Sequence, residues 1–242
     1  MKQIWIIAKR ELKSFFDSLL AYIMLVAFLG FTGFFTWLSG SNVFINGQAN
    51  MAVFFNVSYW TLFFFIPALT MKLIAEEKNT GTIEFMLTKP VSDWQFVTGK
   101  FLSVLVLIGV SLALTLPFYF TIASIGPIDH GAVWTGYLGL LFMSAAYTSI
   151  GVFASSLTSN QIISFLLALF IGIFFHLLFG MIGNSFPGAI GNTLNYLSVS
   201  THYQSITRGV LDTKDIIYFI SLVLTGLLGA EAVLMKRNLS DN

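Results

Sequence analysis

The chain has no cysteine and carries few charges. Without cysteine it can form no disulfide, no thiolate metal site and no cysteine nucleophile. Charged residues make up 10% of the sequence, whereas an average soluble domain carries about 25%. Hydrophobic residues make up 56% and include 26 Phe. A water-soluble fold of 242 residues cannot bury that much apolar surface, so we predict a protein surrounded mostly by lipid.

The common signatures of enzymatic chemistry are also missing. A G-x-x-x-x-G-K-[ST] phosphate loop is absent, because Gly99-Lys100 is followed by Phe101 and lacks the upstream Gly. The sequence contains no G-x-S-x-G and no H-E-x-x-H motif, and its histidines lie far apart, at His130, His176 and His202. No basic stripe is interleaved with aromatics outside the apolar runs, which argues against a nucleic-acid partner. We therefore expect no enzyme, no cofactor held by this chain and no metal site.

Six apolar runs are long enough to cross about 30 Å of hydrocarbon, which takes roughly 20 residues each. They lie near residues 19–38, 53–74, 97–125, 133–157, 161–182 and 216–235. The first run is too long for a signal peptide and lacks its cleavage site, so we interpret it as a retained helix. Pro67 and Pro117 lie within runs and are expected to kink them. The sequence predicts an all-α, polytopic membrane protein with six transmembrane helices, in a single domain over residues 1–242.

The distribution of Lys and Arg gives these spans an orientation. The basic residues group as Lys2, Lys9, Arg10 and Lys13 before the first span, Lys72, Lys78, Lys89 and Lys100 around the second connection, and Lys236 and Arg237 in the tail. With six spans these three regions share one side of the membrane. The opposite side has only Arg208 and Lys214, both in the last loop. Both termini are therefore predicted to be cytoplasmic.

The first 17 residues have a helical pattern of their own. Apolar residues recur at helical spacing while the basic residues fall on the other side; the apolar set is Ile4, Trp5, Ala8, Leu12, Phe15 and Phe16. This pattern predicts an interfacial helix over residues 1–17, lying on the cytoplasmic leaflet. A positive-inside signal that is helical without lying on the membrane explains the same pattern.

The connection at residues 76–91 carries the most information. Gly81 can serve as an N-cap with Glu84 three residues on, and Pro90 disfavours helical geometry just before it. The result is a helix of about two turns, which needs a surface to pack against because isolated helices of that length are marginal in water. Ser92 and Gln95 then form a capping box that starts the third span. An ordinary polar connection, charged only because it is cytoplasmic, is the competing interpretation.

A family resemblance favours the first interpretation. The stretch Glu76 to Pro90, with its Glu-Glu, Gly-Thr-Ile-Glu and Leu-Thr-x-Pro-Val elements and the later Gly99-Lys100, resembles the cytoplasmic loop of ABC-2 type transporter permeases. Ala8-Lys9-Arg10-Glu11-Leu12 resembles the interfacial helix of that family. Residues 155–161 resemble its tight turn between spans four and five, where Thr158 and Gln161 can form a second capping box. The resemblance covers the whole chain.

The resemblance implies a transport subunit without its own ATPase site. Its short loop helix would be a coupling helix that docks on a separate cytoplasmic ABC ATPase subunit, which binds the ATP and magnesium. Two permease chains, identical or related, would pair around an exporter-like route in the bacterial inner (plasma) membrane. The implied docking residues are Glu76, Glu77, Gly81, Thr82, Ile83, Glu84, Leu87 and Pro90. The alternative function is a membrane anchor or assembly subunit that does mechanical work on a periplasmic partner and moves no solute.

Within the family, the short chain and residues 196–203 and 208–215 look most like the gliding-motility-associated permease subunits, which suggests a role in motility or surface-protein export. Permeases linked to copper-site assembly in nitrous oxide reductase have a similar length and loop. The connection at residues 183–215 is long for a loop and rich in apolar residues. We predict short extracytoplasmic or re-entrant helices there, serving as a lid or periplasmic-partner surface, or simply as a packing cap.

Two ionisable residues lie within predicted spans. His176 is a functional candidate because polar side chains at that depth are costly, although a hydrogen bond to a neighbouring helix explains a lone His equally well. Glu231 lies near the cytoplasmic end of the sixth span, where it can reach the interface or pair with a basic group. Proton coupling is expected to need buried acidic residues, and Glu231 is the only acid well inside a predicted span. An ion-coupled carrier is therefore a low-ranking hypothesis.

Overall fold

The computed structural model describes residues 2–40, 43, 48–82 and 91–240, and side chains as far as Lys236. This part of the chain is all-α, as predicted. The helices are α1 (Lys2–Asp17), α2 (Leu19–Trp37), α4 (Ala52–Thr70), α5 (Ala75–Asn79), α7 (Asp93–Ala113), α8 (Leu116–Ile125), α9 (His130–Leu157), α10 (Gln161–Ile173), α11 (Phe179–Ser185), α12 (Ala189–Leu197), α13 (Val199–Thr207) and α14 (Thr213–Ser240), with a π-helix η1 (Phe174–Leu178) between α10 and α11.

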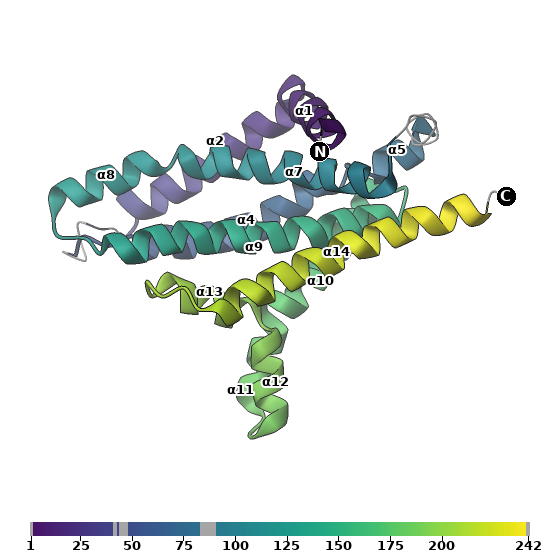
Figure 1. The fold of residues 1–242 in the computed structure, drawn as a ribbon. Coiled ribbons are helices and arrows are strands. Elements are labelled where there is room, and N and C mark those ends of the chain that lie inside the picture. Colours follow the sequence, from purple (N-terminus) through teal and green to yellow (C-terminus); the bar gives the residue numbers. More distant parts are fainter. Residues whose placement is uncertain (1, 41–42, 44–47, 83–90, 241–242) are drawn as a thin grey trace.

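Six helical stretches of the described chain are long and apolar enough to cross a membrane, in agreement with the six predicted spans. They form a bundle whose two ends we call the α5 end, where α5 and the C-terminus lie, and the α8 end (Figure 1). Helix α9 is the centre of the bundle and packs against α4, α7, α10, α13 and α14. Apolar side chains on these helices are fully buried, among them Phe54, Leu62, Leu107 and Leu140.

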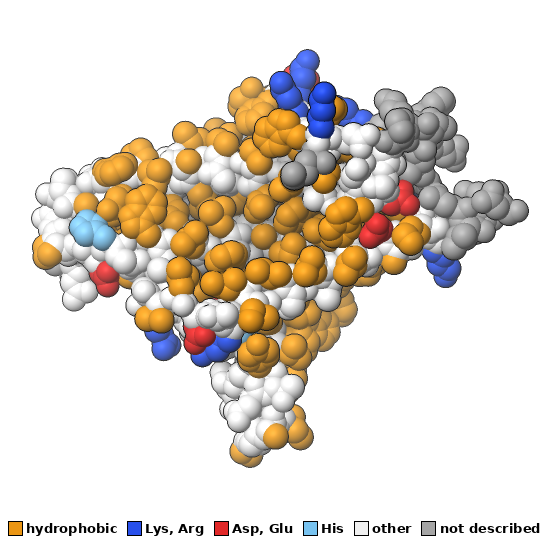
Figure 2. All heavy atoms as spheres, viewed as in Figure 1, with side chains coloured by type: hydrophobic (Ala, Val, Ile, Leu, Met, Phe, Trp, Pro, Cys, Tyr) orange, Lys and Arg blue, Asp and Glu red, His pale blue; other side chains and the backbone are white. Residues whose placement is uncertain are grey.

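The surface of the bundle is apolar along its length. Figure 2 shows hydrophobic side chains spread over the helices, with the charged side chains gathered towards the periphery of the molecule. Exposed large apolar residues include Val26 of α2, Ile162 of α10 and Leu228 of α14. Such a surface is stable against lipid, which accepts apolar side chains on the outside of a protein as readily as inside.

The two prolines within spans act differently. Pro117 lies just after a break at Leu114 and Thr115, so the third span consists of α7 followed by α8. Pro67 lies inside α4, which continues to Thr70 without a break in the helix assignment. Proline removes one backbone donor in both places, but near a helix start that donor has no partner to lose.

The fifth span is not a simple rod. Helix α10 runs with the bundle, then η1 interrupts the regular hydrogen-bond pattern, and α11 and α12 pair as a hairpin that projects sideways from the bundle (Figure 1). Gly183 lies so close to Asn195 that an added Cβ would come within 2.8 Å of the Asn195 backbone N. Helices α12 and α13 confirm the short helices predicted between spans five and six, whereas α11 belongs to the fifth candidate span, Gln161–Ser185.

The helix starts test two predicted caps. Ser92 accepts a hydrogen bond from the Gln95 backbone N–H while the Gln95 side chain accepts one from the Ser92 backbone, so the predicted capping box is confirmed. The second predicted capping box, between Thr158 and Gln161, is wrong. Helix α10 is capped by Asn160, whose side chain accepts from the backbone N–H groups of Ile162 and Ile163. The preceding Thr158 instead bonds the Asn160 backbone N–H.

Helix α1 forms over the predicted range and lies against α7. It buries Ile7, Ala8 and Phe15, whereas Trp5, a member of the predicted apolar face, is 56% exposed. The buried face is therefore rotated slightly from the one that spacing alone predicted. Its position on a membrane surface stays a prediction.

Candidate functional site

The predicted coupling segment begins where α4 gives way to α5. A tight turn over residues 71–74 separates the two helices. Ser155, near the end of α9, lies inside this turn: its hydroxyl oxygen accepts the backbone N–H groups of Ile74 and Ala75, each at 3.0 Å, and donates to the carbonyl of Met71 at 3.1 Å. The hydroxyl thus uses all its hydrogen-bonding capacity to fix the turn. One side chain of the central helix therefore sets the direction in which α5 leaves α4.

A second contact joins α5 to α9. The Lys78 ammonium group donates a hydrogen bond to the carbonyl oxygen of Ser156, next to the residue that holds the turn. Because lysine near a helix C-terminus also interacts favourably with the helix dipole, this contact stabilises the end of α9. The first and fourth residues of α5 are thus both attached to α9.

Lys100 is the centre of a charged cluster that joins three helices. Its side chain, on the second turn of α7, is 1% exposed. The ammonium nitrogen lies 2.9 Å from the Glu77 carboxylate of α5 and 3.4 Å from the Glu11 carboxylate of α1. Lysine is almost never fully buried unless it is paired, because an unpaired buried charge is costly. We call this group, with Arg10, the Lys100 cluster.

Arg10 completes the cluster from the solvent side. Its guanidinium lies 2.5 Å from the Glu11 carboxylate and 3.1 Å from that of Glu77. Burial opposes ionisation of Glu11, but Lys100 and Arg10 outweigh it and hold the pKa of this carboxyl below its usual value. Two cations and two carboxylates therefore balance, which makes the cluster a network of ion pairs and not an isolated surface bridge.

Packing holds α1 and α7 together beside this cluster. A Cβ added at Gly99 would lie 2.8 Å from the Cβ of Ile7 and 3.1 Å from the carbonyl oxygen of Ile4. Only glycine lets the two helices approach this closely. The Gly99-Lys100 pair thus combines a close helix contact with a buried charge, one residue apart.

The structure places four of the predicted docking residues and leaves the other four outside the described part. Glu77 points into the Lys100 cluster, while Glu76 is exposed. Gly81 has a φ of 70°, a left-handed conformation that ends α5 and favours glycine. Thr82 is exposed and its hydroxyl lies 2.9 Å from that of Thr80. Outside the described residues lie Ile83, Glu84, Leu87 and Pro90.

His176 forms the predicted interhelical hydrogen bond and also stacks on aromatic rings. It lies in η1, is 1% exposed, and its Nδ1 is 2.7 Å from the Tyr147 hydroxyl of α9. Its ring is stacked between Phe63 and Tyr59, at centroid distances of 4.2 and 4.1 Å, and Tyr59 stacks in turn on Tyr203 at 4.8 Å. π-Helical turns are rare and frequent at functional sites. Here the turn carries a four-ring stack from inside the bundle to α13.

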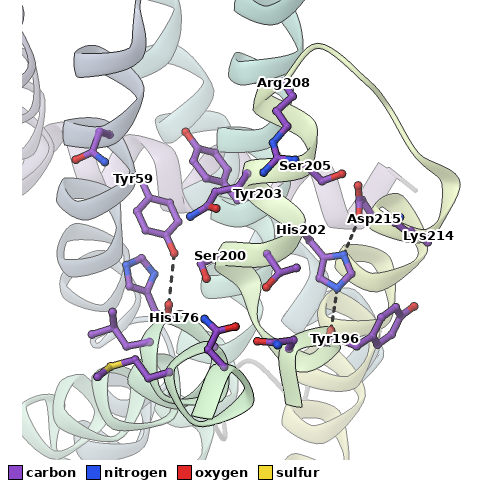
Figure 3. Close-up of a pocket in the computed structure, with 18 of the residues that line it drawn as sticks. Tyr59, His176, Tyr196, Ser200, His202, Tyr203, Ser205, Arg208, Lys214 and Asp215 are labelled. Carbon is purple, nitrogen blue, oxygen red and sulfur yellow. Dashed lines mark hydrogen bonds and ion pairs between the residues drawn. The ribbon is translucent and has the colours of Figure 1, made fainter. Parts of the chain in front are cut away.

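This stack ends at a cavity of about 880 Å³ between α4, η1, α11, α12, α13 and the start of α14. Figure 3 shows Tyr59 and Tyr203 on one side of the cavity and His202 with Asp215 on the other. The Nε2 of His202 donates to the carbonyl of Tyr196 at 2.8 Å, and its Nδ1 lies 2.6 Å from the Asp215 carboxylate. The predicted connection at 183–215 therefore encloses a polar space.

Glu231 is partly exposed on α14, and no ion pair of the described side chains involves it. Across the described residues, no group of three or more His, Cys, Asp or Glu side chains is arranged to hold a metal ion. The structure thus separates two sites: the Lys100 cluster with the Ser155 turn, and the cavity.

Sequence reasoning used Lys100 as a positive-inside residue and as part of the family motif, and it missed the burial of this side chain. The available signal was its position: a lysine that is the eighth residue of an apolar helix lies within the span, where charges are paired. Ser155 was noted only as part of a turn. Its role has no sequence signal, because the turn that it bonds lies about 80 residues earlier in the chain.

Comparison with known proteins agrees with the fold. A family model described as ABC-2 family transporter protein matches residues 5–235, which is nearly the whole chain. A search of curated proteins found no match.

Proposed function

Since the chain belongs to the ABC-2 family of transporter proteins, whose permease subunits lack an ATPase domain, we propose that it transmits force from a separate ATPase to its membrane helices through α5. The observation that carries this proposal is the Lys100 cluster, which attaches the predicted coupling segment to α1 and α7 by buried charges. The chain is a multi-pass permease component with six candidate spans. ATP and magnesium would bind on the partner ATPase.

The proposed force path starts at α5 and divides. Glu77 links α5 to Lys100 of α7 and, through it, to Glu11 of α1. Ser155 links the α4–α5 turn to the central helix α9. Because these ion pairs and hydrogen bonds are largely buried, a displacement of α5 moves helices of the bundle instead of bending a loose loop. Nucleotide-driven closure of the ATPase would supply that displacement.

The same proposal places the α5 end in the cytoplasm of a bacterial cell, with the chain in the inner membrane. Most Lys and Arg residues belong to segments at this end, including α1, α5 and the C-terminal part of α14. The positive-inside rule assigns such an end to the cytoplasm. Both termini are then cytoplasmic, and the α11–α12 hairpin and the cavity belong to the extracytoplasmic half.

A second permease chain would complete the transport route. In the central span, His130–Leu157, 72% of the most apolar window is buried, whereas in Gln161–Ser185 only 22% is buried. A span with so little of its surface covered has a face free for lipid or for another chain. We propose that two copies, or this chain and a related one, pair to form an exporter-like path.

Mechanical work on an extracytoplasmic partner is the second candidate function. It is supported by the α11–α12 hairpin, which projects from the bundle and exposes Met181, Phe186 and Ile190. Gliding motility or surface-protein export would be compatible with either function, and these roles rest on the resemblance of residues 196–203 and 208–215. A closed route with a protein bound at residues 183–215 would favour mechanical work, and an open route would favour transport.

Docking is tested by isolating the chain from native membranes in mild detergent and identifying the proteins that accompany it. An ABC ATPase should accompany the wild type and be lost from a Glu76→Ala/Glu84→Ala variant. Lys9→Gln, an exposed change on α1 outside the predicted docking set, should keep the ATPase. Wild-type protein that comes out folded but alone, under conditions that preserve a known ABC complex, would contradict the proposal.

A further inference from the structure

The cavity is lined mainly by uncharged groups that both donate and accept hydrogen bonds. Its carboxamides are Asn56, Asn184, Asn192, Asn195 and Gln204. Among the described residues, none of these side-chain amides forms a hydrogen bond within the protein. Each offers two N–H donors and one carbonyl acceptor. Five unpaired amides facing one space suit a ligand that donates and accepts at many points.

Two buried polar atoms of the lining residues also lack a partner in the described chain: His176 Nε2 and Asp215 Oδ2. Both residues are 1% exposed. Since Tyr147 occupies His176 Nδ1, the Nε2 atom is left either as an N–H donor or as an acceptor, according to the tautomer. Asp215 Oδ2 needs a donor. A hydroxyl group satisfies each of these atoms in either case, because it donates and accepts.

One of the cationic side chains around the cavity has no acidic partner among the described residues. Asp215 is paired with His202, and Lys214 lies 3.0 Å from the Asp212 carboxylate. Arg208 has no acidic partner among the described residues, and Figure 3 shows its side chain extending beside Ser205 and Tyr203. A ligand with several charges would therefore lack enough oppositely charged partners in the cavity. A ligand with one carboxylate or phosphate group could pair that group with the Arg208 guanidinium.

Size and shape agree with a small polar molecule. The cavity volume of about 880 Å³ falls within the range of about 300–1,000 Å³ that is usual for small-molecule sites. Trp60 and Tyr196 line it and remain 39% and 49% exposed, so ring faces are available beside the amides. Aromatic faces next to amide and hydroxyl groups bind molecules that alternate C–H and O–H surfaces.

We propose that this cavity binds a saccharide unit that carries one acidic group at Arg208. Its hydroxyl groups bond the five amides, His176 and Asp215, and its carboxylate or phosphate pairs with the guanidinium. A free oligosaccharide and the headgroup of a glycolipid offer the same chemistry. The site goes beyond the coupling function, since none of its residues belongs to the Lys100 cluster or the Ser155 turn.

Calorimetric titration of the purified full chain in detergent tests the ligand class. The probes are aldotriouronic acid, a trisaccharide with one glucuronate carboxylate, maltotriose as a neutral trisaccharide, and trialanine. Aldotriouronic acid should bind about tenfold more tightly than maltotriose, because a charge-assisted hydrogen bond is worth more than a neutral one. Trialanine should not bind. A stronger response to trialanine than to both sugars would overturn the saccharide assignment.

Variants show whether binding occurs in this cavity. Asn192→Ala/Gln204→Ala, which removes two exposed amides, should weaken binding of aldotriouronic acid at least about tenfold. Arg208→Gln should abolish the preference for aldotriouronic acid over maltotriose. Gln161→Ala, an amide at the other end of the bundle, is the matched control and should bind as the wild type does. Equal affinity in all four proteins would place the binding elsewhere and overturn the proposal.

A second experiment distinguishes a free oligosaccharide from the headgroup of a glycolipid. The chain is reconstituted in nanodiscs with a glucuronosyl diacylglycerol, and lipid retained after exchange is quantified. Retention by the wild type but not by the Asn192→Ala/Gln204→Ala variant, with no response to soluble sugars, would assign a lipid headgroup. Absence of binding in both experiments overturns the site. ATPase docking is a separate readout, so either proposal can fail while the other stands.

Discussion

The two polar regions of this molecule differ in how many of their hydrogen-bonding groups are paired. At the α5 end, Lys100 is paired with the Glu77 and Glu11 carboxylates and Ser155 uses its hydroxyl as donor and as acceptor. One buried carboxylate oxygen there, Glu77 Oε2, has no partner among the described residues. In the cavity, five amides and the atoms His176 Nε2 and Asp215 Oδ2 have no partner in the described chain. Satisfied buried networks hold a single geometry, whereas unpaired groups are available to a ligand. The comparison assigns transmission to the first region and recognition to the second.

The largest effect is expected from breaking the charge network. Lys100→Met leaves Glu77 and Glu11 with only Arg10, so the folded state should lose about 3 kcal/mol of stability. Thermal unfolding in detergent measures this loss. Lys100→Arg keeps the charge and should lose less, and Lys9→Met, an exposed lysine of the same end, should unfold like the wild type. An unchanged midpoint for Lys100→Met would mean that the cluster does not hold α5.

A smaller loss is expected when the close contact between α1 and α7 is removed. Gly99→Ala puts a methyl group within 2.8 Å of Ile7 and should cost about 2 kcal/mol through overpacking. The same unfolding assay applies. Adding Ile7→Ala should recover only the part of the loss caused by the Ile7 Cγ2 atom, because the Ile7 Cβ stays 2.8 Å from the added methyl group. Gly109→Ala on the same helix meets no atom within 4 Å and serves as control; equal destabilisation by both glycine changes would exclude the proposed helix contact.

A still smaller loss of stability is expected when the hydrogen bonds that hold the turn between α4 and α5 are removed. Ser155→Ala leaves two backbone N–H groups without their acceptor and should cost about 1 kcal/mol, comparable to the loss of a helix cap. Limited proteolysis near residues 71–80 should accelerate. Ser156→Ala is the matched control because that hydroxyl bonds only the Phe153 carbonyl of its own helix. If both variants are cleaved alike, Ser155 does not fix the turn.

Acid should selectively weaken the ion pairs of the Lys100 cluster. Because the folded-state pKa of Glu11 lies below its unfolded value of about 4.5, its ion pairs contribute stability above that pH, and the contribution is lost as pH falls through the folded pKa. Between about pH 5 and about pH 3 the wild type should therefore lose more thermal stability than Glu11→Gln does. Parallel losses in the two proteins would show that Glu11 is not the titrating group.

The cavity variants should change stability least. Asn192→Ala and Gln204→Ala remove exposed side chains without internal hydrogen bonds, so each should shift the unfolding free energy by no more than about 0.5 kcal/mol. Chemical or thermal unfolding without added sugar provides the measurement. A loss of 2 kcal/mol in either variant would show that these amides hold the fold, and the contrast between the two regions would disappear.

Local sequence patterns predicted the helices, whereas the functional sites depend on contacts between residues that are distant in the sequence. Run length and composition gave the six spans, and the Ser92–Gln95 spacing gave the start of α7, because these signals act within one segment. The cap of α10 was assigned to Thr158 instead of Asn160, two residues away, since both residue types can cap. Helix boundaries remain the least predictable feature for that reason.

The functional groupings needed the tertiary structure. Lys100, Glu77 and Glu11 come from three segments, and nothing in their local sequence says that they meet. His176 was recognised as costly in a span, but its π-helix, its ring stack and the cavity beside it depend on α4, α9 and α13 together. The docking residues from Ile83 to Pro90 remain a prediction from resemblance.

The most direct test of transmission through α5 is the ATPase rate of the reconstituted complex, compared with that of the ATPase alone. In wild type and in Lys9→Met the permease should stimulate hydrolysis. In Lys100→Met, assayed at a temperature where the variant is folded and still binds the ATPase, stimulation should fall at least about tenfold, and Lys100→Arg should recover part of it. Full stimulation in folded, ATPase-bound Lys100→Met would contradict the account.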